Sequence, residues 1–198
     1  VGTEEPSGCE PERFQQKYDL RGPFLLYLGR VDKNKGCQKL FDFFLRYKGL
    51  TGSDIKLVLI GGAVLPIPRH PDIRYLGVLG EQDKFDGLAG AELLVMPSFY
   101  ESLSMVTLEA WALGKPVLAN GHCEVLAGQC RRANGGLYYR DYAEFHEALD
   151  LLLVDASLRG VLGRNGLRYY RENYTWEVIE NKYLSVIRQL EEENRCRS

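Results

Sequence analysis

ELLVMPSFYESLSMVTLEAWALGKPVLA, residues 92–119, is the stretch that decides the fold. It opens and closes on short, mainly apolar runs at 92–96 and 116–119, with a turn of small polar residues and a helical segment between them. Continuous short apolar runs are typical of strands that are buried on both faces. Two such strands joined by a helix form a βαβ unit, so the stretch predicts a parallel sheet with right-handed crossovers.

The same alternation of strands and helices continues along most of the chain. Further strands are expected at 24–28, 55–60, 73–76 and 136–139. Helices are expected at 11–18, 36–47, 81–89, 142–153, 158–172 and 176–193. The expected fold class is therefore α/β, with a Rossmann-like parallel sheet flanked by helices. In such sheets, ligands bind beyond the carboxyl ends of the strands.

The composition is that of an ordinary globular protein. The 198 residues are 45% hydrophobic and 26% charged, and the formal net charge is -2. This balance argues against a nucleic-acid binder or an anionic-membrane binder, since both favour a basic surface. The length is typical of one domain that buries a substantial core.

The cysteines and the hydropathy indicate the cellular compartment in which the protein is expected. The five cysteines are Cys9, Cys37, Cys123, Cys130 and Cys196. They form no C-x-x-C pair, and their irregular spacing predicts neither a zinc site nor a disulfide framework. Reduced thiols are typical of cytosolic proteins. With no signal peptide and no apolar run long enough to span a bilayer, the sequence favours a cytoplasmic location.

Two glutamates, Glu101 and Glu109, are separated by seven residues around the start of the helical segment. The turn at 102–104 directs backbone N–H groups and the positive helix end toward any ligand above it. Glu109 lies among apolar helical residues, where an unsatisfied carboxylate is costly. A phosphate over the turn and sugar hydroxyls on both carboxylates would satisfy these groups, which predicts a nucleotide-sugar site. The alternatives are a surface or helix-start charge for Glu101 and an ion pair with a neighbouring helix for Glu109.

The loop GRVDKNKG at 29–36 joins the first strand to its helix. Arg30 and Lys35 can together neutralise a diphosphate, the arginine by its fork of donors and the lysine as a point charge. Gly29 lets the chain turn, and Gly36 is expected to let a ligand approach the helix start. The alternative is a solvated basic loop. Neither a dinucleotide-binding nor a P-loop glycine pattern occurs here.

A glycine-flanked turn follows the third expected strand. Its central residues, Val78 and Leu79, can hold a flat base by their backbone groups, and the alternative is a plain turn. His122, Glu124 and Asp83 are candidate acid–base groups that the sequence does not pair. No D-x-D motif and no His/Cys metal spacing is present, so no divalent metal is predicted.

The glycine-flanked loop at 29–36 and the two glutamates at 101 and 109 resemble the nucleotide-binding half of the family-four retaining glycosyltransferases of the GT-B fold. The resemblance extends from residue 24 to about residue 190. Members of that family usually carry Gly-Phe-Gly after the first glutamate, and this chain has Ser-Leu-Ser at 102–104. The serines permit the turn but narrow the space beside the sugar.

The resemblance implies a role for each site residue. The diphosphate would be bound by Arg30, Lys35 and the backbone N–H groups of Ser104, Met105 and Val106. Glu109 would bind the ribose diol, and Val78 and Leu79 would hold the base. Glu101 would hold hydroxyls of the donor sugar at the catalytic centre.

Family members have two similar Rossmann-like domains with the reaction in the cleft between them, and this chain resembles the donor-binding C-terminal half. Residues 1–23 are expected to be a linker or inter-domain edge, 24–175 the nucleotide-sugar-binding domain, and 176–198 a C-terminal helix and tail. The missing N-terminal domain would supply the acceptor site and any peripheral contact with the inner membrane face. The half alone is therefore expected to be inactive.

The activity implied by the resemblance is retaining transfer of a hexosyl unit from a nucleoside diphosphate sugar to a hydroxyl of a saccharide or lipid-linked acceptor, in polysaccharide or glycoconjugate synthesis. UDP, with UDP-glucose as one example of the donor, is favoured because it is the commoner carrier in the family. No cofactor or metal is expected. The alternatives are a sugar-nucleotide epimerase of the same fold and a non-catalytic nucleotide-sugar-binding domain.

Overall fold

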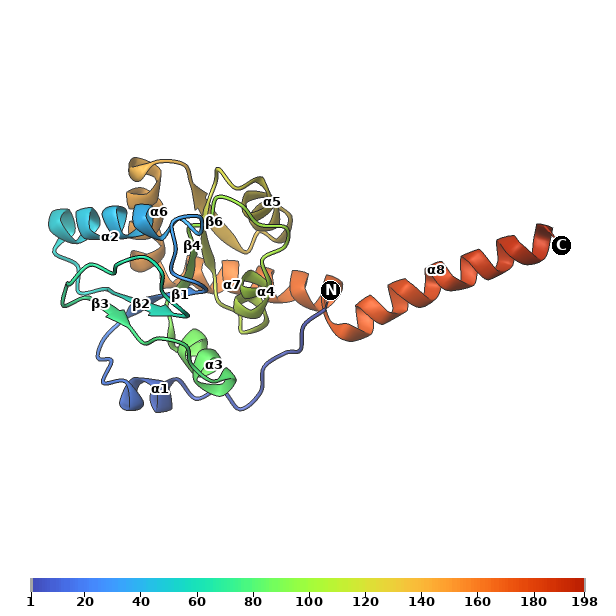
Figure 1. Ribbon diagram of the computed structural model, residues 1–198, viewed down its shortest axis with the longest axis horizontal. Helices are drawn as coiled ribbons and strands as arrows, with labels where there is room; N and C mark the ends of the chain where they lie inside the picture. Colours follow the sequence, from blue (N-terminus) through green and yellow to red (C-terminus); the bar gives the residue numbers. More distant parts are fainter. Residues whose placement is uncertain (1, 198) are drawn as a thin grey trace.

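The computed structural model describes residues 2–197, whose body is a six-stranded sheet with helices on both faces (Figure 1). Neighbouring strands are all parallel, in the order β3-β2-β1-β4-β5-β6. The strands are β1 (Phe24–Leu28), β2 (Lys56–Ile60), β3 (Ile73–Tyr75), β4 (Leu93–Met96), β5 (Val117–Asn120) and β6 (Gly136–Tyr139). The predicted α/β fold with a parallel sheet is confirmed.

The helices form two layers on this sheet. One face is covered by α2 (Cys37–Thr51) and α6 (Tyr142–Val154), and the other by α1 (Pro11–Lys17), α3 (Glu81–Gly90), α4 (Met105–Ala112) and α5 (Glu124–Ala133). Helix α7 (Ala156–Asn173) lies against α4 and contributes to both cores. Successive strand residues point to opposite faces. Accordingly, Leu25 and Tyr27 belong to the core under α2, and Phe24 and Leu26 to the other.

The order of the strands reverses beside β1. The chain runs outward from β1 to β3, returns to β4 on the other side of β1, and continues outward to β6. The loops that follow β1 and β4 therefore lie next to each other at the carboxyl edge, which is where ligands bind in sheets of this type.

Gly36 lets these two loops touch. Its φ is +72°, and a Cβ there would lie 2.0 Å from the carbonyl oxygen of Pro97 in the loop after β4. The space on this side of Gly36 is occupied by the backbone of Pro97, so the glycine is needed for the contact between the loops. Its role in letting a ligand approach the helix start stays a prediction.

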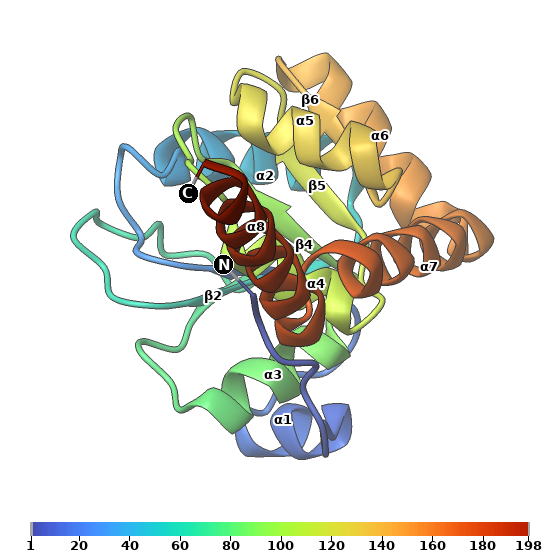
Figure 2. The ribbon, with the colours of Figure 1, turned by 90° about the vertical axis from the view of Figure 1, so that its right-hand side faces the viewer.

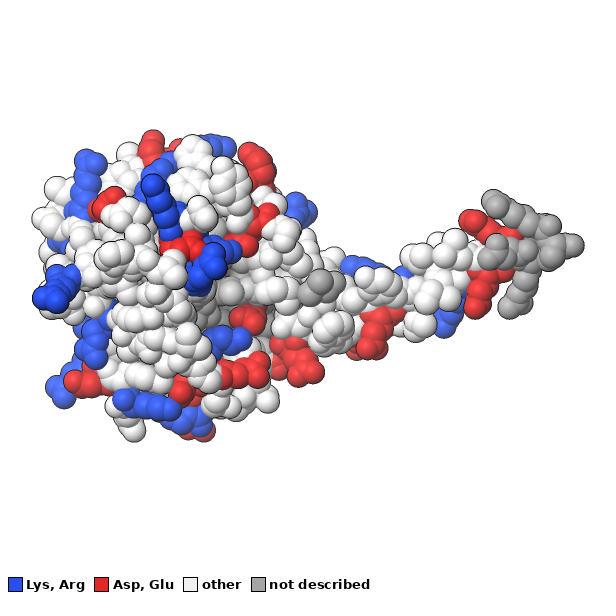
Figure 3. Space-filling model, in the orientation of Figure 1, with Lys and Arg blue, Asp and Glu red and all other residues white. Residues whose placement is uncertain are grey.

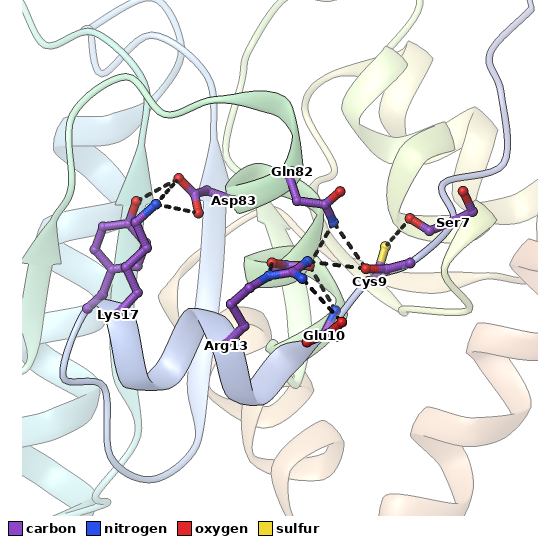
Figure 4. Close-up of polar contacts among 10 residues, drawn as sticks. Ser7, Cys9, Glu10, Arg13, Lys17, Gln82 and Asp83 are labelled. Carbon is purple, nitrogen blue, oxygen red and sulfur yellow. Dashed lines mark hydrogen bonds and ion pairs between the residues drawn. The ribbon is translucent and has the colours of Figure 1, made fainter.

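Helix α1 packs on the body within the segment expected to be a linker or edge. Phe14 is fully buried beside Phe24, with ring centroids 6.0 Å apart. Arg13 donates from Nε to the buried Oδ2 of Asp86 in α3 at 2.6 Å. Burial raises the pKa of Asp86, but the hydrogen bonds from Arg13, the Glu10 N–H and Gln82 together hold that pKa below its usual range. Figure 4 shows α1 facing α3, with Arg13 and Lys17 directed toward α3.

Helix α5 was not among the expected elements. It is ten residues long, and its inward face includes Gly128 and the fully buried Gln129 between apolar residues. Its buried apolar residues Leu126, Cys130 and Ala133 recur at helical spacing around these two residues. The local pattern therefore does indicate a helix here, although none was among the expected elements.

Helix α8 (Trp176–Arg197) extends away from the body (Figures 1 and 2). Several of its apolar side chains are exposed, among them Tyr183, Leu184, Ile187 and Leu190. Within residues 2–197, no helix has both the length and the apolar character needed to cross a membrane. Positive and negative side chains are interspersed over the face of the body shown in Figure 3.

Four cysteines carry free thiols, as expected: Cys9, Cys37, Cys123 and Cys130. The side chain of Cys196 lies outside the described part of the structure, as do residues 1 and 198 at the limits of the expected domains.

Candidate functional site

The loops after β1 and β4 bring a cation and a carboxylate together. Lys35 Nζ lies 2.7 Å from Glu101 Oε1, and the two side chains are 35% and 12% exposed. Both line a cavity of about 220 Å³ that also includes Ser104, Met105 and Val106. Four of the predicted diphosphate ligands and the predicted sugar ligand thus share one cavity.

Asp32 organises the loop that carries the two cations. Its Oδ1 accepts a hydrogen bond from the backbone N–H of Lys35 at 2.8 Å, and its Oδ2 accepts one from Arg30 Nε at 2.5 Å. The Lys35 N–H, helped by the Arg30 guanidinium, holds the pKa of this buried carboxyl below its usual range against the opposing effect of burial. Asp32 was not predicted as a site residue from the sequence, although its position between Arg30 and Lys35 could have indicated it.

Arg30 lies at the edge of this site. Its side chain is largely exposed and does not line the 220 Å³ cavity. Asp32 occupies the Nε of Arg30. Among the described residues no acceptor binds the two terminal nitrogens of this guanidinium, so they can meet an anion.

The N-terminus of α4 has two backbone N–H groups free for an anion. Ser104 is the N-cap, and its Oγ accepts from Thr107 N at 3.2 Å. Its own N–H donates to Oε1 of Gln129 in α5 at 3.4 Å. Within residues 2–197, the N–H groups of Met105 and Val106 donate to no protein acceptor. The positive end of the helix dipole adds to their attraction for a phosphate.

Glu109 is the fifth residue of α4 and lines a second cavity. Its Oε1 is 3.0 Å from Lys84 Nζ of α3, so the ion pair with a neighbouring helix, one of the two alternatives, is present. The cavity of about 560 Å³ is formed by Glu109, α3 residues, Trp176 and the N-terminal segment 2–7. The structure therefore places the two glutamates at neighbouring cavities.

The remaining candidates lie apart from both cavities. Val78 is largely exposed, and Leu79 is partly buried against the core; neither lines the two cavities just described. His122 Nε2 lies 2.9 Å from the carbonyl oxygen of Arg140, and Asp83 binds Lys17. The structure does not bring the candidate acid–base groups together.

No group of three or more metal-ligating side chains occurs within the described range 2–197. The candidate site consists of three cation–carboxylate pairs, Lys35–Glu101, Arg30–Asp32 and Lys84–Glu109, and the N-terminus of α4.

Comparison with known proteins identifies the family of this chain. Residues 22–155 match the model of the glycosyl transferases group 1. The chain belongs to this family. The recognition made from the two motifs is thus confirmed, and the match spans more than half of the chain.

Among its relatives is the capsular polysaccharide biosynthesis glycosyltransferase CapM of Staphylococcus aureus. The two are 24% identical over 216 residues, which cover 96% of this chain and 56% of CapM. The alpha-maltose-1-phosphate synthase of Mycobacterium tuberculosis is 27% identical, over 87% of this chain and 49% of that protein. The chain thus spans about half the length of the relatives it matches.

Solved structures share the fold. The C-terminal domain of the group 1 family protein LpcC from Francisella tularensis superimposes with a TM-score of 0.70 at 19% identity, covering 88% of this chain and all of that domain. Anabaena Alr3699/HepE in complex with UDP-glucose gives a TM-score of 0.79 at 15% identity, over 95% of this chain and 56% of that one. These likenesses confirm the GT-B type of fold for this family member.

Proposed function

We propose that this chain binds the nucleoside diphosphate sugar for a retaining glycosyltransferase that moves a hexosyl unit to a hydroxyl acceptor. The observation that carries the proposal is the pairing of Lys35 with Glu101 beside the free N–H groups of Met105 and Val106. A cation and a helix N-terminus suit a diphosphate, and a carboxylate within the same cavity suits sugar hydroxyls.

Each residue has a distinct task in this proposal. Lys35, Arg30 and the N-terminus of α4 bind the diphosphate and stabilise the negative charge that grows on it as the sugar leaves. Glu101 accepts hydrogen bonds from the hexosyl hydroxyls, which fixes the anomeric carbon relative to the phosphate. Glu109 accepts hydrogen bonds from the ribose, and the backbone at 78–79 holds the base.

The donor carrier proposed is UDP, bound without a metal ion. Two findings support the choice: a structural neighbour was solved with UDP-glucose, and Arg30 and Lys35 provide two cationic side chains on one loop for the diphosphate. The acceptor, a saccharide or lipid-linked hydroxyl, would be bound by a further domain, because this chain spans about half of its relatives.

Calorimetry with UDP and UDP-glucose, in buffer containing EDTA, tests the phosphate part of the site. Lys35→Ala should weaken both ligands about tenfold or more, since a hydrogen bond between charged groups contributes roughly 1.5–3 kcal/mol. Lys33→Ala is the matched control, because Lys33 is exposed in the same loop. Equal effects of the two substitutions would mean that Lys35 makes no specific contact with the phosphates.

The sugar part of the site is tested by Glu101→Gln in the same titrations. The variant should bind UDP nearly as the parent chain does and lose the additional affinity for UDP-glucose. If UDP weakens as much as UDP-glucose, Glu101 does not bind the sugar.

A further inference from the structure

Lys84 holds one oxygen of Glu109 and leaves the other open. The pair joins α3 to α4, with Lys84 Nζ 3.0 Å from Oε1 and side chains that are 26% and 15% exposed. Within the described residues, Oε2 of Glu109 accepts no hydrogen bond. Glu109 lines the 560 Å³ cavity, so its carboxylate has an acceptor oxygen left for a ligand.

Lys84 is itself held in place. Its backbone N–H donates to the carbonyl oxygen of Gly80 at 3.0 Å, in the first turn of α3. Its Nζ lies 4.1 Å from the centroid of the Phe85 ring, where a cation is attracted to the negative face of the ring. The ammonium group is therefore fixed by the ring on one side and by Glu109 on the other.

An ion pair that keeps this partial contact with solvent contributes only modestly to the stability of a fold. The ion pair affects ligand binding more than it affects fold stability. An unpaired glutamate side chain samples several rotamers and loses that freedom when a ligand binds. A glutamate already fixed by Lys84 has less freedom to lose. The ion pair thus favours binding of any hydroxyl that reaches Oε2.

We propose that Lys84 is a positioning residue for the ribose: it orients Glu109 so that the site prefers a ribonucleotide to its 2′-deoxy form. The inference deepens the proposed function and rests on it, since Glu109 is there the ribose ligand. Lys84 makes no contact with the nucleotide in this proposal and acts through the carboxylate alone.

The test is calorimetric titration of the chain with UDP and with 2′-deoxy-UDP, and in parallel with the same pairs of GDP and ADP. The parent chain should bind the ribonucleotide about tenfold more tightly, as expected for one hydrogen bond to a charged group. In Lys84→Met the affinity for the ribonucleotide should fall and that for the 2′-deoxy form should change little, so that the ratio approaches one. Lys84→Arg, which keeps the cation, should restore part of the preference.

Lys17→Met is the matched control. Lys17 Nζ also pairs with a carboxylate of α3, that of Asp83, at 2.8 Å (Figure 4). Within the described residues, Lys17 makes no hydrogen bond or ion pair with Glu109. This variant should keep the parent's ratio, and its melting temperature shows the cost of losing an ordinary pair on this helix.

Each other outcome overturns the inference. An equal loss of both nucleotides in Lys84→Met would mean that Lys84 binds the phosphates directly. A lowered melting temperature with an unchanged ratio would make the pair purely structural. A parent chain that binds nucleotides without a ribose preference would remove the role of Glu109 and leave the phosphate site standing. A parent chain that binds none of the nucleotides would overturn the proposed function itself.

Discussion

At the scale of single residues, the site is a set of charges that compensate one another. Lys35 pairs with Glu101, Lys84 with Glu109 and Arg30 with Asp32. A cluster of like charges would repel itself in the absence of a ligand, and these alternating pairs avoid that cost. A nucleotide sugar offers both an anion and hydroxyl donors, so it can bind the cations and the carboxylates together.

Asp32 gives a prediction that separates positioning from simple attraction. Removing an anion beside two cations should strengthen the binding of an anionic ligand if net charge alone decides affinity. We expect the opposite for Asp32→Asn: UDP should bind about fivefold more weakly or worse, because the amide keeps one acceptor oxygen and can no longer accept from both the Lys35 N–H and Arg30 Nε. Calorimetry at two salt concentrations provides the measurement, and a gain in affinity would contradict the positioning role.

The lowered pKa of Asp32 also predicts a pH dependence of stability. Since its folded pKa lies below the unfolded value of about 3.9, the carboxylate stabilises the fold fully above that value. This contribution is lost as the pH falls through the folded pKa. Urea unfolding should therefore show the parent more stable than Asp32→Asn at pH 7, with the difference shrinking below about pH 4. A difference that stays constant with pH would mean that the substitution acts by another route.

At the scale of elements, the site depends on two loops that meet at the carboxyl edge of the sheet. Lys35 comes from the loop after β1 and Glu101 from the loop after β4, and the reversal of strand order places these loops side by side. The close contact of Gly36 with Pro97 sets their separation. The N-terminus of α4 is set in turn by Gln129 from α5.

Two glycines at the ends of α2 allow a matched test of this contact. Gly36 and Gly52 both have left-handed φ, at +72° and +63°, but an added Cβ meets Pro97 O at 2.0 Å in the first and nothing within 4 Å in the second. Gly52→Ala should cost about 1–2 kcal/mol of unfolding free energy, the penalty of that backbone conformation alone. Gly36→Ala should cost more and also weaken UDP, because the loops must separate. Equal costs in urea unfolding would show that the contact can relax freely.

At the scale of the whole molecule, the body forms a complete sheet with two covered faces while α8 extends away from it (Figure 1). The chain thus has its own core, and the proposed donor site is built entirely from its residues. Donor binding should therefore not require another domain, whereas transfer should, because relatives are about twice as long.

A nucleotide should accordingly stabilise the isolated chain. Ligand at a hundredfold over its dissociation constant adds about 2.7 kcal/mol, and each kcal/mol raises the melting temperature of a domain of this size by roughly 2–4 °C. Saturating UDP should therefore raise the melting temperature by about 5–10 °C, with or without EDTA. Sugar transfer to any acceptor by this chain alone should stay at background. Robust turnover would refute the proposal that transfer requires a further domain.

What the sequence alone determined is the set of local features. Short apolar runs alternating with helical segments predicted the parallel sheet, because hydrophobic period and run length report on burial. The motifs at 29–36 and 101–109 indicated the family. The predictions of fold and family succeeded because they depend on neighbours within a few residues.

Only the tertiary structure decided which groups meet. Lys35 and Glu101 are 66 positions apart, and Lys84 and Glu109 are 25 apart; strand order and helix packing, rather than local propensity, bring them within 3.0 Å. Helix α5 went unpredicted although its apolar residues recur at helical spacing. The hydrogen bond between its buried Gln129 and Ser104, 25 positions away, depends on tertiary packing. Periodicity reports where a side chain points, and the three-dimensional packing of distant segments sets what it touches.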